Sequence, residues 1–147
     1  MELRKPVRGP IRAQDIMTKN PVAVEVTSMV QEVSDKLFAA DVRHIPVVSK
    51  GELVGIVSDR DLRSYLLPRD ERLAHADVAN ERLRAPVSAV LQGDVISVHP
   101  DTEIQEVIDL MVDQKIGAVP VVESTNNRLL GIISYVDVLR VASEYLP

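Results

Sequence analysis

The sequence contains no cysteine, no tryptophan and a single phenylalanine among its 147 residues. Without cysteine the chain has neither a disulfide framework nor thiolate chemistry, which fits a reducing compartment, and we expect a cytoplasmic protein. Because aromatic side chains are so scarce, the core must be built from valine, isoleucine, leucine, methionine and alanine. Such a core favours close layers of strands and helices.

Long apolar runs and an excess of positive charge are also missing. No stretch approaches the roughly 20 apolar residues of a membrane span, and no apolar segment follows the basic N-terminus as in a secretory signal. Acidic side chains outnumber basic ones by 22 to 17, which opposes binding to a phosphate backbone. We therefore expect neither a membrane nor a nucleic acid as a partner. The glycine spacing of a phosphate-binding loop is absent as well.

The sequence does contain a long internal repeat. Ile45-Pro-Val-Val and Leu53-Val-Gly-Ile-Val-Ser-Asp-Arg-Asp return as Val119-Pro-Val-Val and Leu129-Leu-Gly-Ile-Ile-Ser-Tyr-Val-Asp. The copies are offset by 74 residues before the intervening turn and by 76 after it, so the second hairpin loop is two residues longer. One copy is too small to bury a core alone, and we expect the two copies to pack face to face.

Each copy shows the same order of hydrophobic patterns: a helical lead-in, a strand, a helix, a hairpin of two strands and a final helix. This order predicts a mixed sheet with a right-handed crossover. Thr27 or Ser28, and Asp101 or Thr102, are the expected N-caps of the first long helices, with Gln31 and Gln105 completing capping boxes after Ser28 and Thr102. The expected elements are lead-ins at 13–17 and 86–91, strands at 22–26 and 96–98, hairpins at 45–57 and 119–133, and final helices at 59–67 and 135–145. The expected segments are a flexible basic leader at 1–12, the first copy at 13–67, a charged, partly helical surface connector at 68–85, and the second copy at 86–147.

A serine followed three residues later by an aspartate ends the last strand of both copies, as Ser58 with Asp61 and Ser134 with Asp137. At the start of a helix this arrangement is suited to an anion, and the carboxylate is suited to a vicinal diol such as a ribose. The same spacing forms a capping box that needs no ligand. Because the pair recurs at the same place in both copies, we expect it to cap the helix and to contact a ligand.

Three motifs and their second-copy counterparts resemble a tandem pair of cystathionine-β-synthase (CBS) domains, called a Bateman module, over about residues 13–145. They are Asp15-Ile-Met-Thr18, Arg43-His-Ile-Pro-Val-Val48 and Gly55-Ile-Val-Ser-Asp-Arg-Asp61. The resemblance implies an α+β fold in which two pseudo-two-fold-related CBS repeats form one CBS-pair module. It implies a regulatory, energy-sensing module without catalytic activity, which binds AMP, ADP or ATP, or in some members S-adenosylmethionine or a dinucleotide, in clefts between the repeats. No cofactor is required, although Mg²⁺ can accompany a triphosphate, and the partners are a second copy of the chain and an unidentified protein effector.

The resemblance also assigns residues to the two clefts. The aspartate would hold the ribose, the serine and nearby basic groups the phosphate, and apolar residues the base. The first cleft would contain Arg43, His44, Ile45, Pro46, Ser58, Arg60 and Asp61, closed by Gly93, Val95 and Ile96. The second would contain Gly117, Ala118, Val119, Pro120, Ser134, Val136 and Asp137, closed by Thr18, Asn20, Pro21 and Val22.

The two clefts differ where phosphate would lie, because Gly117, Ala118 and Val136 replace Arg43, His44 and Arg60. Charge-assisted hydrogen bonds contribute about 1.5 to 3 kcal/mol each. We therefore expect the Asp61 cleft to be the better nucleotide site and the Asp137 cleft to be weak, empty or suited to a less charged adenosyl ligand, unless Lys19 or Lys115 restores a charge there.

Other interpretations of the same residues remain open. Arg43 and Arg60 would be ordinary surface charges in a ligand-free dimerisation scaffold. A small nucleotide hydrolase would use His44 with Asp59 or Asp61. The same three side chains are the only candidates for a metal site, but the second copy offers no matching set, and we expect no catalytic or structural metal.

Overall fold

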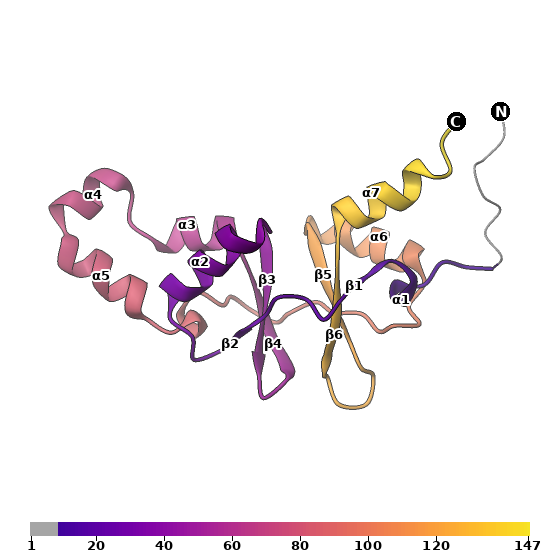
Figure 1. Ribbon diagram of the computed structural model, residues 1–147, viewed down its shortest axis with the longest axis horizontal. Coiled ribbons are helices and arrows are strands. Elements are labelled where there is room, and N and C mark those ends of the chain that lie inside the picture. The colour runs from indigo at the N-terminus through magenta and orange to yellow at the C-terminus, as the bar shows by residue number, and fades with distance from the viewer. Residues whose placement is uncertain (1–8) are drawn as a thin grey trace. The chain divides into compact units, whose positions relative to one another are not determined.

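The computed structural model describes residues 9–147 (Figure 1). The first eight residues of the expected basic leader, 1–12, lie outside the described residues. The last two are held in place: the Ile11 carbonyl accepts a hydrogen bond from the Ile104 N–H at 2.9 Å, and Arg12 forms an isolated antiparallel bridge with Glu103. The N-terminal segment is thus anchored before the first helix begins.

The chain divides into two compact units that do not coincide with the two sequence copies. The β3–β4 unit consists of Val22–Val95, and the β5–β6 unit consists of residues up to Pro21 together with Ile96–Pro147. Each unit therefore combines the body of one copy with the lead-in of the other. The lead-in of the first copy is the helix α1 (Ala13–Ile16), and that of the second is a short 3₁₀ turn, η1 (Val87–Ala89).

The β3–β4 unit contains a three-stranded mixed sheet in the order β2-β3-β4. β2 runs parallel to β3, while β3 and β4 form an antiparallel hairpin, as expected from the sequence. The turn between them is Lys50-Gly51, with φ values of 52° and 85°, and positive φ at both central residues is typical of the type I′ turn of tight hairpins. The elements are β2 (Val24–Glu25), α2 (Val30–Ala40), β3 (His44–Ser49), β4 (Glu52–Ser58), α3 (Asp59–Tyr65), α4 (Arg69–Ala74) and α5 (Ala76–Arg84).

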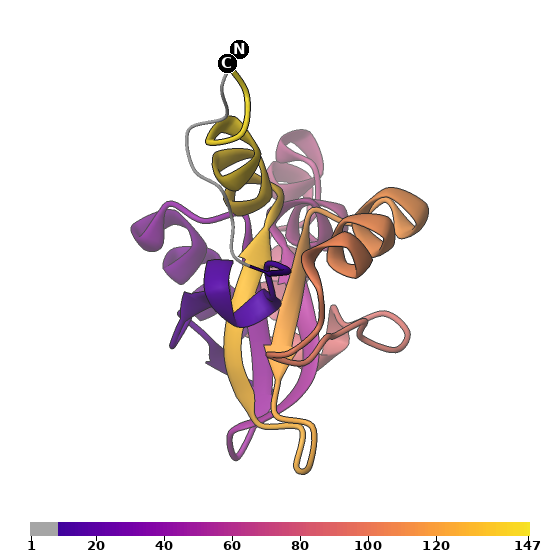
Figure 2. The same ribbon diagram turned by 90° about the vertical axis from the view of Figure 1, so that its right-hand side faces the viewer.

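The β5–β6 unit contains a three-stranded sheet in the order β1-β6-β5, and the pairings of β6 with β1 and with β5 are both antiparallel. Figure 2 shows α1 beside β6. The strand β1 (Thr18–Lys19) was not expected, because a two-residue strand leaves no periodic pattern in the sequence. The remaining elements are α6 (Ile104–Gln114), β5 (Ala118–Val122), β6 (Leu129–Ser134) and α7 (Tyr135–Ser143).

The strand expected at 96–98 is reduced to a single parallel bridge between Val98 and Val121. In the first copy the ladder continues, because the Val26 N–H donates to the Val48 carbonyl at 2.9 Å. The residue equivalent to Val26 is Pro100, which has no N–H to donate. This proline therefore stops the parallel ladder in the second copy.

The expected N-caps of the long helices are wrong. α2 begins at Val30 after Met29, and α6 begins at Ile104 after Glu103, in both cases without a side-chain cap. Instead, main-chain carbonyls of distant segments accept from the first helical N–H groups, Ala85 from Val30 at 2.9 Å and Ile11 from Ile104 at 2.9 Å. These long-range bonds satisfy the donors that a cap would otherwise satisfy.

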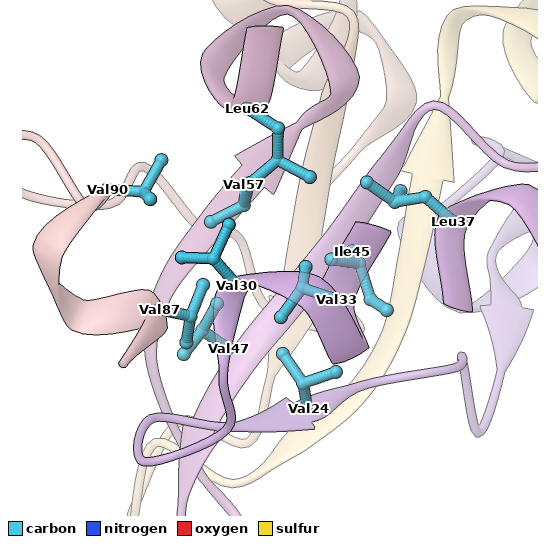
Figure 3. Close-up of a cluster of buried hydrophobic side chains, with 10 residues drawn as sticks. All are labelled: Val24, Val30, Val33, Leu37, Ile45, Val47, Val57, Leu62, Val87 and Val90. Carbon is cyan, nitrogen blue, oxygen red and sulfur yellow. The ribbon is translucent and has the colours of Figure 1, made fainter. Parts of the chain in front are cut away.

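Each unit has its own core of aliphatic side chains, as the scarcity of aromatic residues predicts. Figure 3 shows the core of the β3–β4 unit, where Val30 and Val33 of α2 meet Ile45 and Val47 of β3. Val24, Leu37, Val57, Leu62, Val87 and Val90 complete this cluster. The core of the β5–β6 unit consists of Ala13, Val98, Val107, Val119, Val121 and Ile133.

The charged connector, expected to be partly helical, is almost entirely helical, as α4 and α5. Ala79 of α5 is buried and α5 packs on α2, so only part of the connector is a free surface. Arg82 donates from Nη1 to the Tyr65 carbonyl at 2.8 Å, and its guanidinium lies 5.7 Å from the centre of the Tyr65 ring. This contact attaches α5 to the C-terminal end of α3.

Gly55 and Gly131 are strand residues at which a lead-in side chain approaches the sheet closely. A Cβ atom at Gly55 would lie 2.6 Å from Cδ2 of Leu91, and one at Gly131 would lie 2.6 Å from Sδ of Met17 and 2.9 Å from the Thr18 carbonyl oxygen. Both glycines therefore make room for the lead-ins. At Gly131 the main chain itself is part of the obstruction.

We predict that Gly131→Ala lowers the free energy of unfolding by about 1–3 kcal/mol, the usual cost of overpacking. Gly55→Ala is the matched control and should cost less, because the flexible end of Leu91 can move whereas the Thr18 carbonyl is held in β1. Urea-induced unfolding followed by circular dichroism measures both. Equal losses would contradict this account of the two positions.

Candidate ligand-binding sites

The first candidate site is the turn from β4 to α3, where Ser58 and Asp61 form a reciprocal capping box. The Ser58 N–H donates to Asp61 Oδ2 at 2.9 Å, and the Asp61 N–H donates to Ser58 Oγ at 3.0 Å. Both residues are half-buried. Within residues 9–147, Asp61 Oδ1 has no hydrogen-bond or ion-pair partner, so it is available to accept from a ligand hydroxyl.

The second candidate site repeats this geometry at the turn from β6 to α7. The Ser134 N–H donates to Asp137 Oδ2 at 2.8 Å, and the Asp137 N–H donates to Ser134 Oγ at 3.3 Å. Asp137 Oδ1 lies 3.8 Å from Nη1 of Arg140, with the aspartate side chain only 15% exposed. The expected capping role is thus present in both copies, and one carboxylate oxygen of each remains outside the cap.

Arg43 lies beside the first turn, but its guanidinium is already engaged by a carboxylate. Nη1 of Arg43 donates to Asp59 Oδ2 at 2.9 Å, and Nη2 of Arg63 lies 3.9 Å from the same oxygen. The hydrogen bond from Arg43 is the main cause that lowers the pKa of Asp59. These three side chains help to line a groove of about 480 Å³ between α2 and α3, whose lining also includes the apolar residues Leu37, Phe38, Val42, Leu62 and Leu66.

His44 pairs with Ser58 across the hairpin and is half-buried. Burial lowers the pKa of His44, while the negative charges of Asp59 and Asp61 act in the opposite direction. Both carboxylates are therefore within electrostatic reach of the imidazole. The ring is neutral at pH 7, and an anionic ligand would favour its protonated form.

The remaining residues of the first expected set have three different environments. Arg60 is exposed and makes no ion pair within the described chain, so its guanidinium is free to meet a phosphate. Gly93, with φ of 63°, is exposed and Val95 is half-buried. Ile45 and Pro46 are buried strand residues, which places them in the core and not on an open surface. Ile96 belongs to the other compact unit.

The second expected set shows the same division. Val136 is 44% exposed and occupies the position of Arg60, while Ala118, Val119 and Pro120 are buried in β5 and Gly117 is half-buried. Thr18 pairs with Ile132 in the sheet, and Pro21 is half-buried. Asn20 has a left-handed φ of 47°, and its N–H donates to the Leu130 carbonyl at 3.2 Å. Val22 belongs to the other compact unit.

The two lysines proposed to restore a charge to the second site lie on different elements. Lys19 lines an open hollow of about 570 Å³ with Gln14, Asp15, Met17, Asn20, Pro100 and Leu130. Lys115 ends α6 with a left-handed φ of 54° and is exposed. Neither lysine makes an ion pair within residues 9–147. The two clefts expected between the repeats stay predictions.

The sequence of both repeats agrees with one family over most of the chain. The sequence model of the CBS domain family matches two segments of the chain, residues 13–68 and residues 87–144. The chain belongs to the CBS domain family. Its two CBS repeats therefore form the tandem pair that the sequence motifs indicate.

Relatives with CBS domains are found among proteins of several lengths. The CBS domain-containing protein YhcV of Bacillus subtilis is 29% identical over 126 residues, which are 84% of this chain and 80% of YhcV. MJ1225 of Methanocaldococcus jannaschii is 30% identical over 128 residues, 86% of this chain but 45% of that protein. The chain spans 23% of a homoserine O-acetyltransferase of Methanocorpusculum labreanum. The chain thus spans less than half of the length of the latter two relatives.

Solved structures share the fold of the CBS pair. A protein of Vibrio cholerae named for acetoin utilization, AcuB, is 32% identical with a TM-score of 0.73, and the similarity covers 91% of each chain. The CBS domain pair of MJ0100, solved with 5-methylthioadenosine and S-adenosyl-L-methionine, is 25% identical with a TM-score of 0.71 and covers 90% of this chain and 99% of that one.

Between residues 9 and 147 no three His, Cys, Asp or Glu side chains are grouped as ligands for a metal ion. No helix in the described part of the CBS pair is long and apolar enough to cross a membrane.

Arg63 is a part of the first site that was not expected from the sequence, and Asp59 was considered there only as a hydrolase or metal-binding residue, not as the partner of Arg43. A signal for Asp59 was present, because the hairpin register that pairs His44 with Ser58 places Arg43 and Asp59 next to each other. The Asp59 N–H donates to the Arg43 carbonyl at 3.0 Å, which continues this pairing by one step. Arg63 then follows from the helical spacing of four residues.

We predict that the stability of the CBS pair falls between pH 7.5 and 5.5 and that His44→Gln removes part of this loss. The pKa of His44 is lower in the folded protein than the ordinary 6.5, so the unfolded chain binds the proton more readily and acidification through that value favours unfolding. Urea midpoints of wild type and variant, measured across this range, test the effect. His75→Gln in the exposed connector is the control, and an identical pH slope for His44→Gln and wild type would contradict the prediction.

Proposed function

We propose that this CBS pair is a regulatory module that binds an adenosine-containing ligand, with the Ser58–Asp61 turn as its principal site. The supporting observation is the half-buried Asp61 carboxylate, whose Oδ2 is fixed by the cap while Oδ1 stays open. A carboxylate oxygen held in this way suits the hydroxyl groups of a ribose. Adenosine, its phosphates and S-adenosylmethionine all carry this sugar.

The groups around Asp61 fit the rest of such a ligand. Arg60 offers an exposed, permanently charged donor for phosphate, and His44 offers an imidazole that gains charge when an anion is bound. Family membership and the adenosyl ligands of MJ0100, a protein of the same fold, support this ligand class. Mg²⁺ would enter only together with a triphosphate.

The Ser134–Asp137 turn is proposed as a second and weaker site for anions. Its capping box is intact, but Gly117, Ala118 and Val136 supply no charge where the first site has Arg43, His44 and Arg60. A ligand held there would depend on its ribose and base. An uncharged or cationic adenosyl compound fits this site better than a nucleotide.

Regulation would follow if the bound ligand favours one arrangement of the two repeats, which changes the surface offered to a protein effector. We propose no catalytic role, since His44 with Asp59 or Asp61 has no counterpart in the second repeat. A hydrolase would release phosphate from ATP and lose that activity in His44→Ala. A ligand-free scaffold would show no thermal stabilisation by any adenosine compound. The cytoplasmic location stays a prediction.

We predict that Asp61→Asn lowers the affinity for AMP at least about tenfold, the effect of losing one charge-assisted hydrogen bond. The asparagine oxygen can still accept from the Ser58 N–H, so the cap and the unfolding free energy should change little. Isothermal titration calorimetry gives the affinity, and urea unfolding checks the stability. Asp137→Asn is the matched control in the other repeat and should leave the stronger AMP site intact. Equal AMP affinity in wild type and Asp61→Asn would refute the assignment of this site.

We also propose that the CBS pair forms a homodimer through the face of α6 and α7. Val112 of α6 and Tyr135 and Leu139 of α7 are 67%, 52% and 60% exposed. The equivalent positions in the other repeat are Phe38, Asp59 and Arg63, so the α6–α7 face is the less charged of the two. Large apolar side chains exposed together are typical of an interface.

A single charge on this face should therefore weaken the dimer. We predict that Leu139→Asp shifts the protein from dimer to monomer in sedimentation velocity at micromolar concentration, because a carboxylate would be buried without a partner. Leu73→Asp is the control, since Leu73 lies on α4 and is 81% exposed. A wild-type monomer, or a dimer equally stable in Leu139→Asp, would exclude this interface.

A further inference from the structure

The main chain places Arg43 next to a carboxylate. Arg43 directly precedes β3, and Asp59 is the first residue of α3. The hydrogen bond from the Asp59 N–H to the Arg43 carbonyl, at 3.0 Å, extends the pairing of β3 with β4 beyond His44 and Ser58. The proximity of the two side chains is therefore a consequence of the hairpin register and not of a chance surface contact.

The charges of this cluster partly cancel. Asp59 Oδ2 lies 2.9 Å from Arg43 and 3.9 Å from Arg63, so one carboxylate serves two guanidinium groups. The hydrogen bond from Arg43 keeps the pKa of Asp59 below its ordinary value, and Asp59 is ionised at neutral pH. Arg43 is 75% exposed, so a bound anion can reach it. That anion must compete with Asp59 for the same guanidinium.

Asp59 also acts on the turn that holds Asp61. Asp59 directly follows Ser58 as the first residue of α3, and His44 pairs with Ser58 across the hairpin, so Asp59 and Asp61 belong to the same turn. The negative charges of both carboxylates act to raise the pKa of His44. A phosphate bound at this turn has two alternatives. It can take the guanidinium of Arg43 and so displace Asp59, or it can leave the ion pair intact and lie near the ionised Asp59 carboxylate without contacting Arg43. Both costs increase with the number of negative charges on the ligand.

We propose that Asp59 determines the charge preference of the Ser58–Asp61 site, which accordingly favours adenosine ligands with no phosphate or one phosphate over polyphosphates. This inference rests on the function proposed above. It assigns to Asp59 a selective role that is separate from ribose binding. The second repeat lacks the whole cluster, because Gly117, Tyr135 and Leu139 stand in place of Arg43, Asp59 and Arg63.

The test compares AMP and ATP by calorimetry in Mg²⁺-free buffer at low salt. Wild type should bind AMP more tightly than ATP. Asp59→Asn, which keeps the shape and removes the charge, should strengthen ATP binding about tenfold and AMP binding about threefold or less, because ATP carries more negative charges. Asp70→Asn is the control for net charge, since Asp70 lies in α4 and makes no ion pair within residues 9–147. It should leave the ratio of the two affinities unchanged.

Three further measurements separate charge selection from a structural effect. In an Arg43→Ala background, the gain that Asp59→Asn gives to ATP should fall to less than half, because the two residues act through their ion pair. The pKa of His44, followed by the proton resonances of its ring, should fall in Asp59→Asn, because one of the two charges that raise it is removed. In 0.5 M NaCl the preference for AMP should shrink through screening.

The outcomes distinguish this inference from the function on which it rests. Nucleotide binding that requires Asp61 but has the same AMP-to-ATP ratio in wild type and Asp59→Asn overturns the inference and leaves the proposed function standing. An equal change of that ratio in Asp70→Asn, or an unchanged pKa of His44 in Asp59→Asn, also overturns it. If AMP, ATP, adenosine and S-adenosylmethionine all fail to bind to wild type and to Asp59→Asn, both proposals are wrong.

Discussion

The antiparallel register of each hairpin determines where the residues beside each Ser-x-x-Asp turn lie. In β3–β4 it sets His44 opposite Ser58, and in β5–β6 it sets Ala118 opposite Ser134. A slip by one residue would turn every side chain to the other face and separate these partners. The tight Lys50-Gly51 turn, and the register shifts between Val47 and Val48 and between Val121 and Val122, are the local features that hold this alignment.

Upon this shared frame the two repeats have diverged mainly in charge. Both retain the serine and aspartate of the capping box, which the fold needs whether or not a ligand is present. Around it the first repeat has an arginine, a histidine and a second carboxylate, while the second has small or apolar residues. The cap thus accounts for what the repeats share, and the surrounding charges account for how their binding properties would differ.

Elements that depend on local sequence were predicted well, and those that depend on distant segments were not. The hairpins, the mixed sheet and the two final helices follow from β-branched runs and from the Ser-x-x-Asp spacing. The starts of α2 and α6 were misplaced, because carbonyls of Ala85 and Ile11 satisfy their N–H groups across a long sequence separation. The exchange of lead-ins between the repeats is likewise invisible in a periodic pattern.

The candidate site shows the same limit. The positions of Ser58 and Asp61 at the end of a strand were foreseeable from their spacing, whereas the engagement of Arg43 by Asp59 needs the register of strands separated by a turn. Ile45 and Val119 were expected to enclose a base; their side chains are fully buried in their cores, and their place in a site stays a prediction. Hydrophobic character in the sequence does not distinguish a residue that lines a site from one that fills a core.

The exchanged lead-ins have a consequence for synthesis on the ribosome. The β3–β4 unit is one continuous segment, Val22–Val95, and its contacts can all form once that segment has emerged. The β5–β6 unit needs α1 and β1 from the start of the chain and β6 from its end. α1 and β1 are translated before the β3–β4 unit and β6 after it, so nascent chains halted once Val95 has emerged would contain one finished unit and an α1–β1 segment still lacking its sheet.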